Sequence, residues 1–239
     1  MIEENDVVKV DLRGLPEEID FASMTAKIKS QKNNTANTWQ KNRSSFRKFT
    51  DLFPGDLAKN IVRIYLALND INTRDYDKER TDDFKYPDKF DLQYEEKFFE
   101  IKSSIEKYNS DMAVIINNRN FIIYRGKELK DIIIQVFFIF SDENGKTFLN
   151  DLEKCEEKDF KEKYDIQSED DFIELFIKYS PSTYILGFVL SKDIDPTKNY
   201  SVQTTQIKSD FKRDYVKQII KEGRPMKELV TMLKNGVKE

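Results

Sequence analysis

The chain has 239 residues, of which 38% are hydrophobic and 13% aromatic, enough for one folded domain with a sizeable core. It contains no histidine and one cysteine, which excludes histidine-based catalytic triads, zinc sites built from histidines or several cysteines, and an internal disulfide. Because these residues are missing, hydrolytic chemistry would have to rest on carboxylates, lysines and a bound metal ion. The formal net charge of −4 argues against a uniformly basic surface.

The sequence also bears on location and cofactors. No apolar run reaches the length of a membrane span. The first residues, with Glu3, Glu4 and Asp6, lack the basic and apolar regions of a signal peptide. No glycine-rich phosphate loop is present. We therefore expect an intracellular, cytoplasmic protein that contacts no membrane and uses no nucleotide cofactor.

The first third of the chain is predicted to contain one strand and two helices. Val7 to Leu12 is typical of a short apolar strand, and Asp20 to Ser30 of a helix opened by an acidic cap. A second helix is expected to start at Pro54-Gly55-Asp56 and to end near Leu68, because its apolar residues recur with helical spacing. The charged stretch 72–85 is expected to be an irregular loop beside the segment that follows it.

Charge is unevenly distributed along the chain. Residues 21–50 contain no acid and carry Lys or Arg at seven positions, whereas acids dominate from Asp142 to Glu174. Amides and arginines read base edges and lysines contact phosphates, so 21–50 is a candidate DNA-contacting segment. A flexible polar loop is the alternative. The candidate contact residues are Lys32, Asn33, Asn34, Lys41, Arg43, Ser44 and Arg47.

Residues Tyr86 to Ser104 are predicted to form two short strands joined by a tight turn at Glu95-Glu96, because apolar and polar residues alternate on both sides of it. A two-residue turn sets Asp91 opposite Glu100, with Lys102 on the face of Glu100. Adjacent carboxylates repel unless a positive charge lies between them. Mg²⁺ typically takes one or two carboxylates plus water and phosphate, so this face is a candidate site for metal-assisted phosphodiester hydrolysis. An ordinary hairpin whose charges face water is the alternative.

This pattern resembles the motif of the PD-(D/E)xK nuclease superfamily, in which an acidic residue on one strand precedes Glu-x-Lys on the next. The matching positions are Asp91, Glu100 and Lys102. Pro87-Asp88 is the literal "PD" pair, but its offset places Asp88 on the face opposite Asp91, so Asp88 is kept as an accessory candidate. The resemblance is specific only over about residues 85–104.

The resemblance implies a fold, a cofactor and ligands. The fold is α/β, with a mixed central β-sheet flanked by helices in a restriction-endonuclease-like core. The cofactor is Mg²⁺, for which Mn²⁺ substitutes, held by Asp91, Glu100 and the carbonyl of Ile101. Lys102 positions the attacking water. An acid near the start of the preceding helix sometimes aids metal binding, which makes Asp56 an accessory candidate; the alternative is that Asp56 complements the helix dipole.

The middle of the chain is predicted to be rich in strands. Met112 to Asn117 and Phe121 to Tyr124 are typical of a hairpin around Asn118-Arg119. Ile132 to Phe140 is almost continuously apolar, as expected of a central strand covered on both faces. Its single polar residue, Gln135, is expected either to orient an active-site water as an accessory residue or to bond to backbone.

The remaining segments alternate between acidic and basic. Asn150 to Tyr179 is predicted to be helical and to lie away from DNA, because its acids would be repelled by phosphate. Tyr184 to Leu190 is typical of a strand. Asp210 to Lys221 and Pro225 to Lys234 are predicted helices separated by Gly223.

Residues 201–224 form a second candidate DNA-contacting segment. Its polar stretch is expected to reach a groove through Gln203, Thr205, Gln206 and Lys208, with a plain surface loop as the alternative. Lys212, Arg213 and Lys217 could contact phosphates or form a solvated face.

Together, these features predict a single nuclease domain over residues 1–239. Within the superfamily it resembles a Type II restriction endonuclease of a restriction–modification system, a Mg²⁺-dependent hydrolase that cuts double-stranded DNA at a specific sequence and leaves 5′-phosphates. A homodimer is expected, because two-fold symmetric DNA favours a two-fold symmetric protein. The alternatives are a structure-selective nuclease or resolvase of the same fold, and a non-catalytic DNA-binding module.

Overall fold

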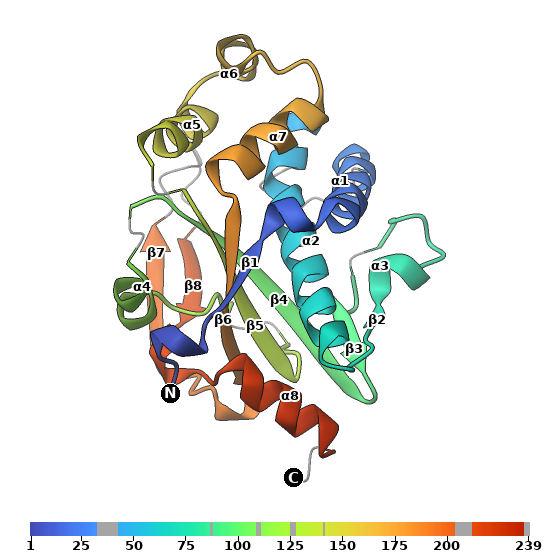
Figure 1. The fold of residues 1–239 in the computed structure, drawn as a ribbon, viewed down its shortest axis with the longest axis vertical. Helices are drawn as coiled ribbons and strands as arrows, with labels where there is room; N and C mark the ends of the chain where they lie inside the picture. The colour runs from blue at the N-terminus through green and yellow to red at the C-terminus, as the bar shows by residue number, and fades with distance from the viewer. Residues whose placement is uncertain are drawn as a thin grey trace.

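The computed structural model describes residues 1–32, 43–86, 88–108, 111–124, 128–140, 142–203 and 212–236, with the backbone alone at 199–203 and 212–213. Six strands form one curled mixed sheet in the order β1-β6-β5-β4-β3-β2 (Figure 1). Neighbouring strands are antiparallel except for β4 and β5, which are parallel. The expected α/β class with a mixed central sheet is therefore confirmed. The strands are β1 Val8–Asp11, β2 Arg74–Asp75, β3 Leu92–Tyr94, β4 Lys97–Glu106, β5 Ile132–Ile139 and β6 Ser182–Leu190.

Helices cover both faces of this sheet (Figure 1). One face packs against α1 (Pro16–Gln31), α2 (Ser45–Leu68) and α7 (Glu169–Tyr179) and forms the larger core. The other face packs against α4 (Met112–Asn118) and against β8 of a separate two-stranded ribbon, and forms a smaller second core. The ribbon strands are β7 Asn199–Gln203 and β8 Lys212–Val216, and the remaining helices are α3 Tyr76–Glu79, α5 Glu143–Lys154, α6 Glu157–Tyr164 and α8 Met226–Lys234.

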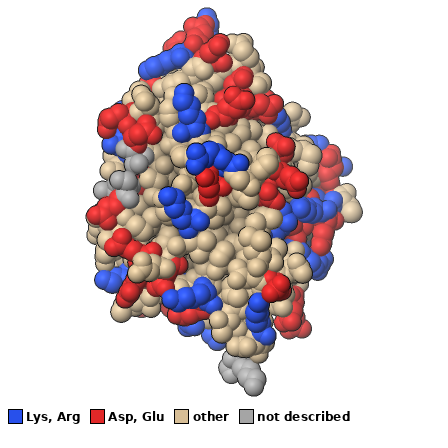
Figure 2. Space-filling model, viewed as in Figure 1, with Lys and Arg blue, Asp and Glu red and all other residues tan. Residues whose placement is uncertain are grey.

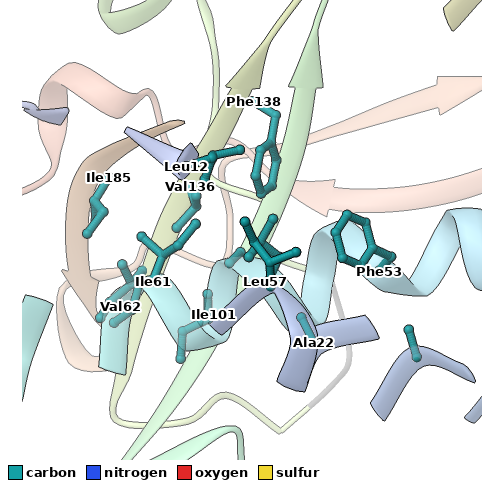
Figure 3. Packing of buried hydrophobic residues seen from close by; sticks show 14 of the residues in the cluster. Leu12, Ala22, Phe53, Leu57, Ile61, Val62, Ile101, Val136, Phe138 and Ile185 are labelled. Atoms are coloured by element: carbon teal, nitrogen blue, oxygen red, sulfur yellow. The ribbon is translucent and has the colours of Figure 1, made fainter. Parts of the chain in front are cut away.

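The larger core fixes the position of the predicted hairpin. Leu57 and Ile61 of α2 pack toward Ile101 of β4 and Val136 of β5 (Figure 3). Burying each such aliphatic side chain contributes roughly 1.5–3 kcal/mol. All eight residues of β5 are buried, which confirms it as the central strand predicted over Ile132 to Phe140. Strand β4 is thus held by pairing with β5 and by packing of its buried face on α2.

Helix α2 begins nine residues earlier than expected, and Pro54 lies inside it. Ser44 caps the helix, because its hydroxyl accepts a hydrogen bond of 3.1 Å from the Arg47 N–H. An interior proline costs about 3 kcal/mol. Burial of Phe46, Phe49 and Phe53 on the first turns more than offsets that cost at roughly 1.5–3 kcal/mol each. The prediction that the helix starts at Pro54 is therefore wrong.

Two further secondary-structure predictions are wrong. Residues 112–118 form helix α4 rather than a strand, because the Asp111 carboxylate caps the N–H groups of Ala113 and Val114 and the helix buries Ile115 in the second core. The segment 121–124 contributes one isolated bridge, between Tyr124 and Tyr215 of β8. Within the predicted helix 210–221, residues 212–216 form strand β8, because pairing with β7 overrides the weak helical preference of its charged residues.

The other predicted elements agree in type with the structure. The strands over Val7 to Leu12 and Tyr184 to Leu190 appear as β1 and β6, and the helices over Asp20 to Ser30 and Pro225 to Lys234 as α1 and α8. The acidic segment from Asn150 is helical, but it is divided between α5, α6 and α7. Among the helices that the structure describes, none has both the length and the apolar character needed to cross a membrane.

Candidate active site

The predicted hairpin forms with the predicted register as far as Leu92 and Phe99, and the predicted pair of Asp91 with Glu100 lies beyond the paired strands. Leu92 pairs with Phe99 and Tyr94 with Lys97, across a two-residue turn. Pairing between β3 and β4 ends at Leu92, while β4 continues to Glu106 with β5 along its other edge. The edge of β4 that faced β3 is therefore left without a partner strand after Phe99.

Asp91 lies where this pairing ends. Its Oδ2 accepts a hydrogen bond of 2.6 Å from the Ile101 N–H, so the carboxylate caps the first backbone group of β4 beyond the hairpin. Asp91 is partly buried. Burial raises its pKa to about 6, although the Ile101 N–H and the nearby Lys59 and Lys102 favour the charged form. The side chain is thus a carboxylate kept in a site that opposes its charge.

Glu100 and Lys102 form an ion pair on the next stretch of β4. Both side chains are partly exposed, so Lys102 does not lie in the apolar interior. The Lys102 Nζ also lies 5.1 Å from the ring centroid of Tyr124, within the range of a cation–π contact. Asp91 and Lys102 are close enough for the lysine to act on the Asp91 charge. The structure therefore places Lys102, which is paired with Glu100, within electrostatic range of Asp91.

A network of ions lies beside Asp91. It is formed by the buried side chains of Lys29, Lys59, Arg80, Asp56, Asp75 and Asp77 and by the more exposed Asp88. The Lys29 Nζ lies 2.7 Å from Asp56 Oδ1 and 2.8 Å from Asp77 Oδ2. Burial opposes the charge of Lys29, but Asp56 and Asp77 raise its pKa above the usual value. Lys59 contacts Asp77 and lies 3.0 Å from Asp75. We refer to this group as the ion network.

Asp77 is the centre of the ion network because it contacts three cations. Burial would raise its pKa, but Lys59 and Lys29 lower it to about 2. Arg80 contacts Asp77 at 3.2 Å and Asp88 at 2.5 Å. These contacts tie α3 and Asp88 to α1 and α2. The expectation of an irregular loop over 72–85 is wrong for residues 74–79, where β2 and α3 form, and agrees with the structure over 80–85.

Both accessory acids belong to the ion network. Asp56 lies in the interior of α2, so its predicted role at a helix start is wrong. Burial raises the pKa of Asp56 despite its ion pair with Lys29, and its Oδ2 has no hydrogen-bond partner among the described residues. Asp88 contacts Lys29 and Arg80. Their participation in metal binding stays a prediction.

Gln135 is fully buried and bonds within the protein. Its Nε2 donates to the carbonyl of Lys102 and to the Ser104 hydroxyl, each at 3.1 Å, and its Oε1 accepts from the Ile122 N–H at 3.0 Å. This supports the backbone-bonding alternative. The amide holds the backbone of Lys102 against the extended segment that carries Tyr124.

Most of the described cations of the basic segment 21–50 pair with other groups of the protein. Lys32 contacts Asp83, Arg43 contacts Asp51, and Arg47 donates to the carbonyls of Leu152 and Cys155. The Ser44 hydroxyl bonds to the Glu157 carboxylate. These contacts join the start of α2 to α5 and α6, so the acidic helices lie beside one of the two candidate DNA-contacting segments. Their placement away from DNA stays a prediction.

Arg43, Ser44 and Arg47 also line a cavity of about 730 Å³ between α2, α5 and the end of β4. Four carboxylates share its wall, those of Asp51, Glu153, Glu156 and Glu157. Figure 2 likewise shows acidic and basic side chains interspersed over the visible face. The pairing of these cations with carboxylates and carbonyls weakens their attraction for a polyanion. Their contact with DNA stays a prediction.

Several predicted site residues lie outside the described residues. The side chain of Gln203, in β7, belongs to the part described by its backbone alone. The others are Asn33, Asn34, Lys41, Thr205, Gln206 and Lys208, together with Pro87 of the literal "PD" pair.

Sequence reasoning missed the ion network and Tyr124. The signal in the sequence was a lysine on the otherwise apolar face of each of the two helices α1 and α2. Lys29 follows Ile19, Ala22 and Ala26 at helical spacing on the buried face of α1, and Lys59 lies on the buried face of α2. A buried lysine requires a carboxylate partner. The acid-rich stretch 75–83 was the obvious source.

Within the described ranges, no group of three or more His, Cys, Asp or Glu side chains is arranged to hold a metal ion. A metal at the hairpin would therefore need oxygen ligands in addition to the carboxylates of Asp91 and Glu100. No family model matches this chain, and no curated protein or solved structure is significantly similar to it.

Proposed function

We propose that the chain is a Mg²⁺-dependent Type II restriction endonuclease that cuts double-stranded DNA at a specific sequence and leaves 5′-phosphates. The observation that carries this proposal is Asp91, a partly buried carboxylate with a pKa raised to about 6, beside the Glu100–Lys102 pair. A divalent cation would relieve the cost of keeping this charge. The mixed sheet, with α2 preceding and packing on the hairpin, agrees with the core that the PD-(D/E)xK motif implies.

The donor atoms suit Mg²⁺. Asp91 and Glu100 offer carboxylate oxygens, and the Ile101 carbonyl offers a third. The N–H and C=O of one strand residue point to the same edge, so the Ile101 carbonyl shares the edge at which Asp91 bonds to the Ile101 N–H. Two carboxylates and one carbonyl leave positions for water and a phosphate oxygen, which is the usual composition of a Mg²⁺ site. When bound, the ion would stabilise the charge that develops on the phosphoryl oxygens.

The chain's own residues have distinct roles in this proposal. Lys102 orients the attacking water through its ammonium, which the Glu100 carboxylate and the Tyr124 ring hold in place. Attack in line with the leaving 3′-oxygen gives a 5′-phosphate. The side-chain amide of Gln135 fixes the backbone of Lys102 by donating a hydrogen bond to the Lys102 carbonyl. Two copies of the chain would match the symmetry of a duplex recognition site.

The test is cleavage of supercoiled plasmid and phage DNA with Mg²⁺, with Mn²⁺ and with EDTA. We expect metal-dependent fragments with 5′-phosphates and their loss in Glu100→Gln and Lys102→Met. Glu96→Gln, on the exposed turn of the same hairpin, is the matched control and should cut normally. Wild-type cleavage by either site variant would refute the site. Cutting of four-way junctions but not of linear duplex would indicate a structure-selective nuclease. Binding to DNA without any cutting would indicate a non-catalytic DNA-binding module.

A further inference from the structure

Phe98 of β4 differs from the other phenylalanines that the structure describes. Phenylalanine is usually buried, and Phe98 is the one described phenylalanine among the exposed large hydrophobic residues, with 36% of its surface accessible. Its neighbour Phe99 and the next core residue, Ile101, are buried in the larger core. The chain therefore leaves one aromatic ring at the surface of the strand that carries Glu100 and Lys102.

Phe98 lies on the same face of β4 as Glu100 and Lys102. Side chains alternate between the two faces of a strand, and the buried residues between these three belong to the opposite face. Two residues of strand span about 6–7 Å, so Phe98 occupies the position next to Glu100 on this face. An exposed ring thus borders the candidate active site on the side of the hairpin turn.

Two further aromatic side chains hold the Phe98 ring in place. The ring centroids of Phe98 and Phe90 are 5.2 Å apart, and those of Phe90 and Tyr76 are also 5.2 Å apart. The guanidinium of Arg80, a member of the ion network, lies 5.1 Å from the Tyr76 ring centroid. The Phe98 N–H donates to the Asp131 carboxylate at 2.8 Å. We refer to Tyr76, Phe90 and Phe98 as the aromatic platform.

The backbone joins the aromatic platform to Asp91. Phe90 directly precedes Asp91 in the chain. The Tyr76 N–H donates to the Asp91 carbonyl at 3.4 Å, and the Asp91 N–H donates to the Phe99 carbonyl at 3.1 Å. The hydrogen bonds that position the Asp91 carboxylate therefore also position the platform. Because the ring is already held, little conformational freedom is lost when a ligand stacks on it.

The ligand group that suits an exposed ring beside a phosphodiester site is a nucleobase. Bases stack on aromatic side chains whatever their sequence, because every base has a π-face. In a paired duplex the neighbouring bases cover both faces, so a base reaches a protein ring only when it is unpaired or turned out of the helix. Unstacking costs least at a mismatched or unpaired base. The position of the platform therefore indicates a strand that is distorted beside the cut.

We propose that Phe98 is a substrate-contacting residue whose ring stacks on a base turned out of the duplex next to the scissile phosphate. The inference rests on the proposed function, because Phe98 would act on the strand that Glu100 and Lys102 cut. It also names a preferred substrate, DNA with an unpaired nucleotide at the cleavage site. A fully paired duplex binds more weakly, since its base must first be unstacked.

The test compares two short duplexes of one sequence, one fully paired and one with a single extra, unpaired thymine. Binding of the full chain is measured in EDTA by fluorescence anisotropy, and the wild type should prefer the unpaired thymine roughly fivefold to a hundredfold. Phe98→Leu keeps an apolar contact with Phe90 but has no π-face, so it should lose the preference, whereas Phe98→Trp should keep it. The matched control Tyr108→Leu removes an exposed ring just beyond the end of β4 and should bind like the wild type.

A second readout locates the base. With 5-iodouracil in place of the unpaired thymine, irradiation joins the base to an aromatic side chain that it touches, and mass spectrometry should identify the peptide that contains Phe98. Unchanged urea midpoints would show that the variants fold. If Phe98→Leu does not fold, a folded Phe98→Trp that loses the preference would overturn the inference.

Three other results would also overturn it. The first is equal binding of the wild type to the two duplexes, and the second is a preference that Phe98→Leu retains. The third is a halved molar mass of Phe98→Leu in light scattering, because Phe98 would then be a contact between two copies of the chain.

The outcomes separate this inference from the proposed function. A wild type that prefers the unpaired thymine through Phe98 but never cuts DNA would refute the nuclease and leave Phe98 as a base-stacking residue. A Phe98→Leu variant that binds and cuts every substrate as the wild type does would refute the inference and leave the nuclease. A wild type that binds neither duplex would overturn both.

Discussion

Replacing Asp91 by Asn tests whether this carboxylate is kept for function at a cost to stability. Asn has the same shape, and its Oδ1 can still accept from the Ile101 N–H, so the change removes the charge and leaves the cap of β4 in place. Asp91 has a pKa of about 6 in the fold, against about 3.9 for an aspartate in an unfolded chain. The folded state therefore binds the proton more tightly.

The sign of the effect follows from this difference. The contribution of Asp91 favours folding below pH ~4 and is lost as the pH rises through about 6. At pH 7 the charged aspartate would cost at most about 3 kcal/mol relative to a neutral side chain. Asp91 is only partly buried, so solvent reduces the expected cost to about 1–2 kcal/mol. Asp91→Asn should be more stable than the wild type by that amount at pH 7.5 and nearly equal to it at pH 4.

The assay is urea unfolding in EDTA at pH 4, 5.5 and 7.5, with unchanged m-values as the check on two-state behaviour. Mg²⁺ should raise the wild-type midpoint and leave that of Asp91→Asn unchanged, because a bound ligand stabilises only the state that binds it. The matched control is Asp131→Asn, whose carboxylate accepts from the Phe98 N–H of β4 at 2.8 Å and should give no gain at pH 7.5. A destabilised Asp91→Asn at every pH would refute the reasoning and leave Asp91 as a structural cap.

Two further variants test the surroundings of the site. Asp77→Ala should destabilise the fold by about 3–5 kcal/mol, because it leaves buried cations without their shared partner. The pKa of Asp77 is about 2 in the fold, so the stability advantage of the wild type should be present above pH ~4 and shrink toward pH 2 in acid unfolding. A stability difference that does not change with pH would contradict this. Gln135→Leu should lower the free energy of unfolding in urea by about 1–3 kcal/mol, because it removes the side-chain partner of the Ile122 N–H and of the Lys102 carbonyl. A loss below about 0.5 kcal/mol would show that these groups find other partners.

Local pattern was sufficient to predict the hairpin and the central strand. The register of β3 and β4 followed from alternation and a two-residue turn, which are properties of neighbouring residues. The burial of β5 followed from its unbroken apolar run. Glu100 and Lys102 could be assigned to one face for the same reason, since they are two residues apart on one strand.

Contacts between distant residues could not be predicted in this way. The run Ala113 to Ile116 has high strand propensity, but the Asp111 cap and burial against the second core favour a helix. Residues 212–216 form a strand only because β7 lies beside them. Similarly, the absence of acids near Lys29 in the sequence suggested an available basic surface, whereas the fold brings Asp56 and Asp77 to it from 27 and 48 residues away.

The ion network explains how a segment with few apolar residues can position Asp91. Residues 72–86 and 88–91 contribute little to either hydrophobic core, yet Asp75, Asp77 and Asp88 fix them to Lys29 of α1 and Lys59 of α2. A buried ion pair gives little net stability compared with apolar packing, but removal of one partner is costly because a charge is left uncompensated. The network therefore penalises any displacement of this segment more than a set of apolar contacts would. Such a penalty suits a site in which one carboxylate must stay within hydrogen-bonding distance of the Ile101 N–H while its charge is disfavoured.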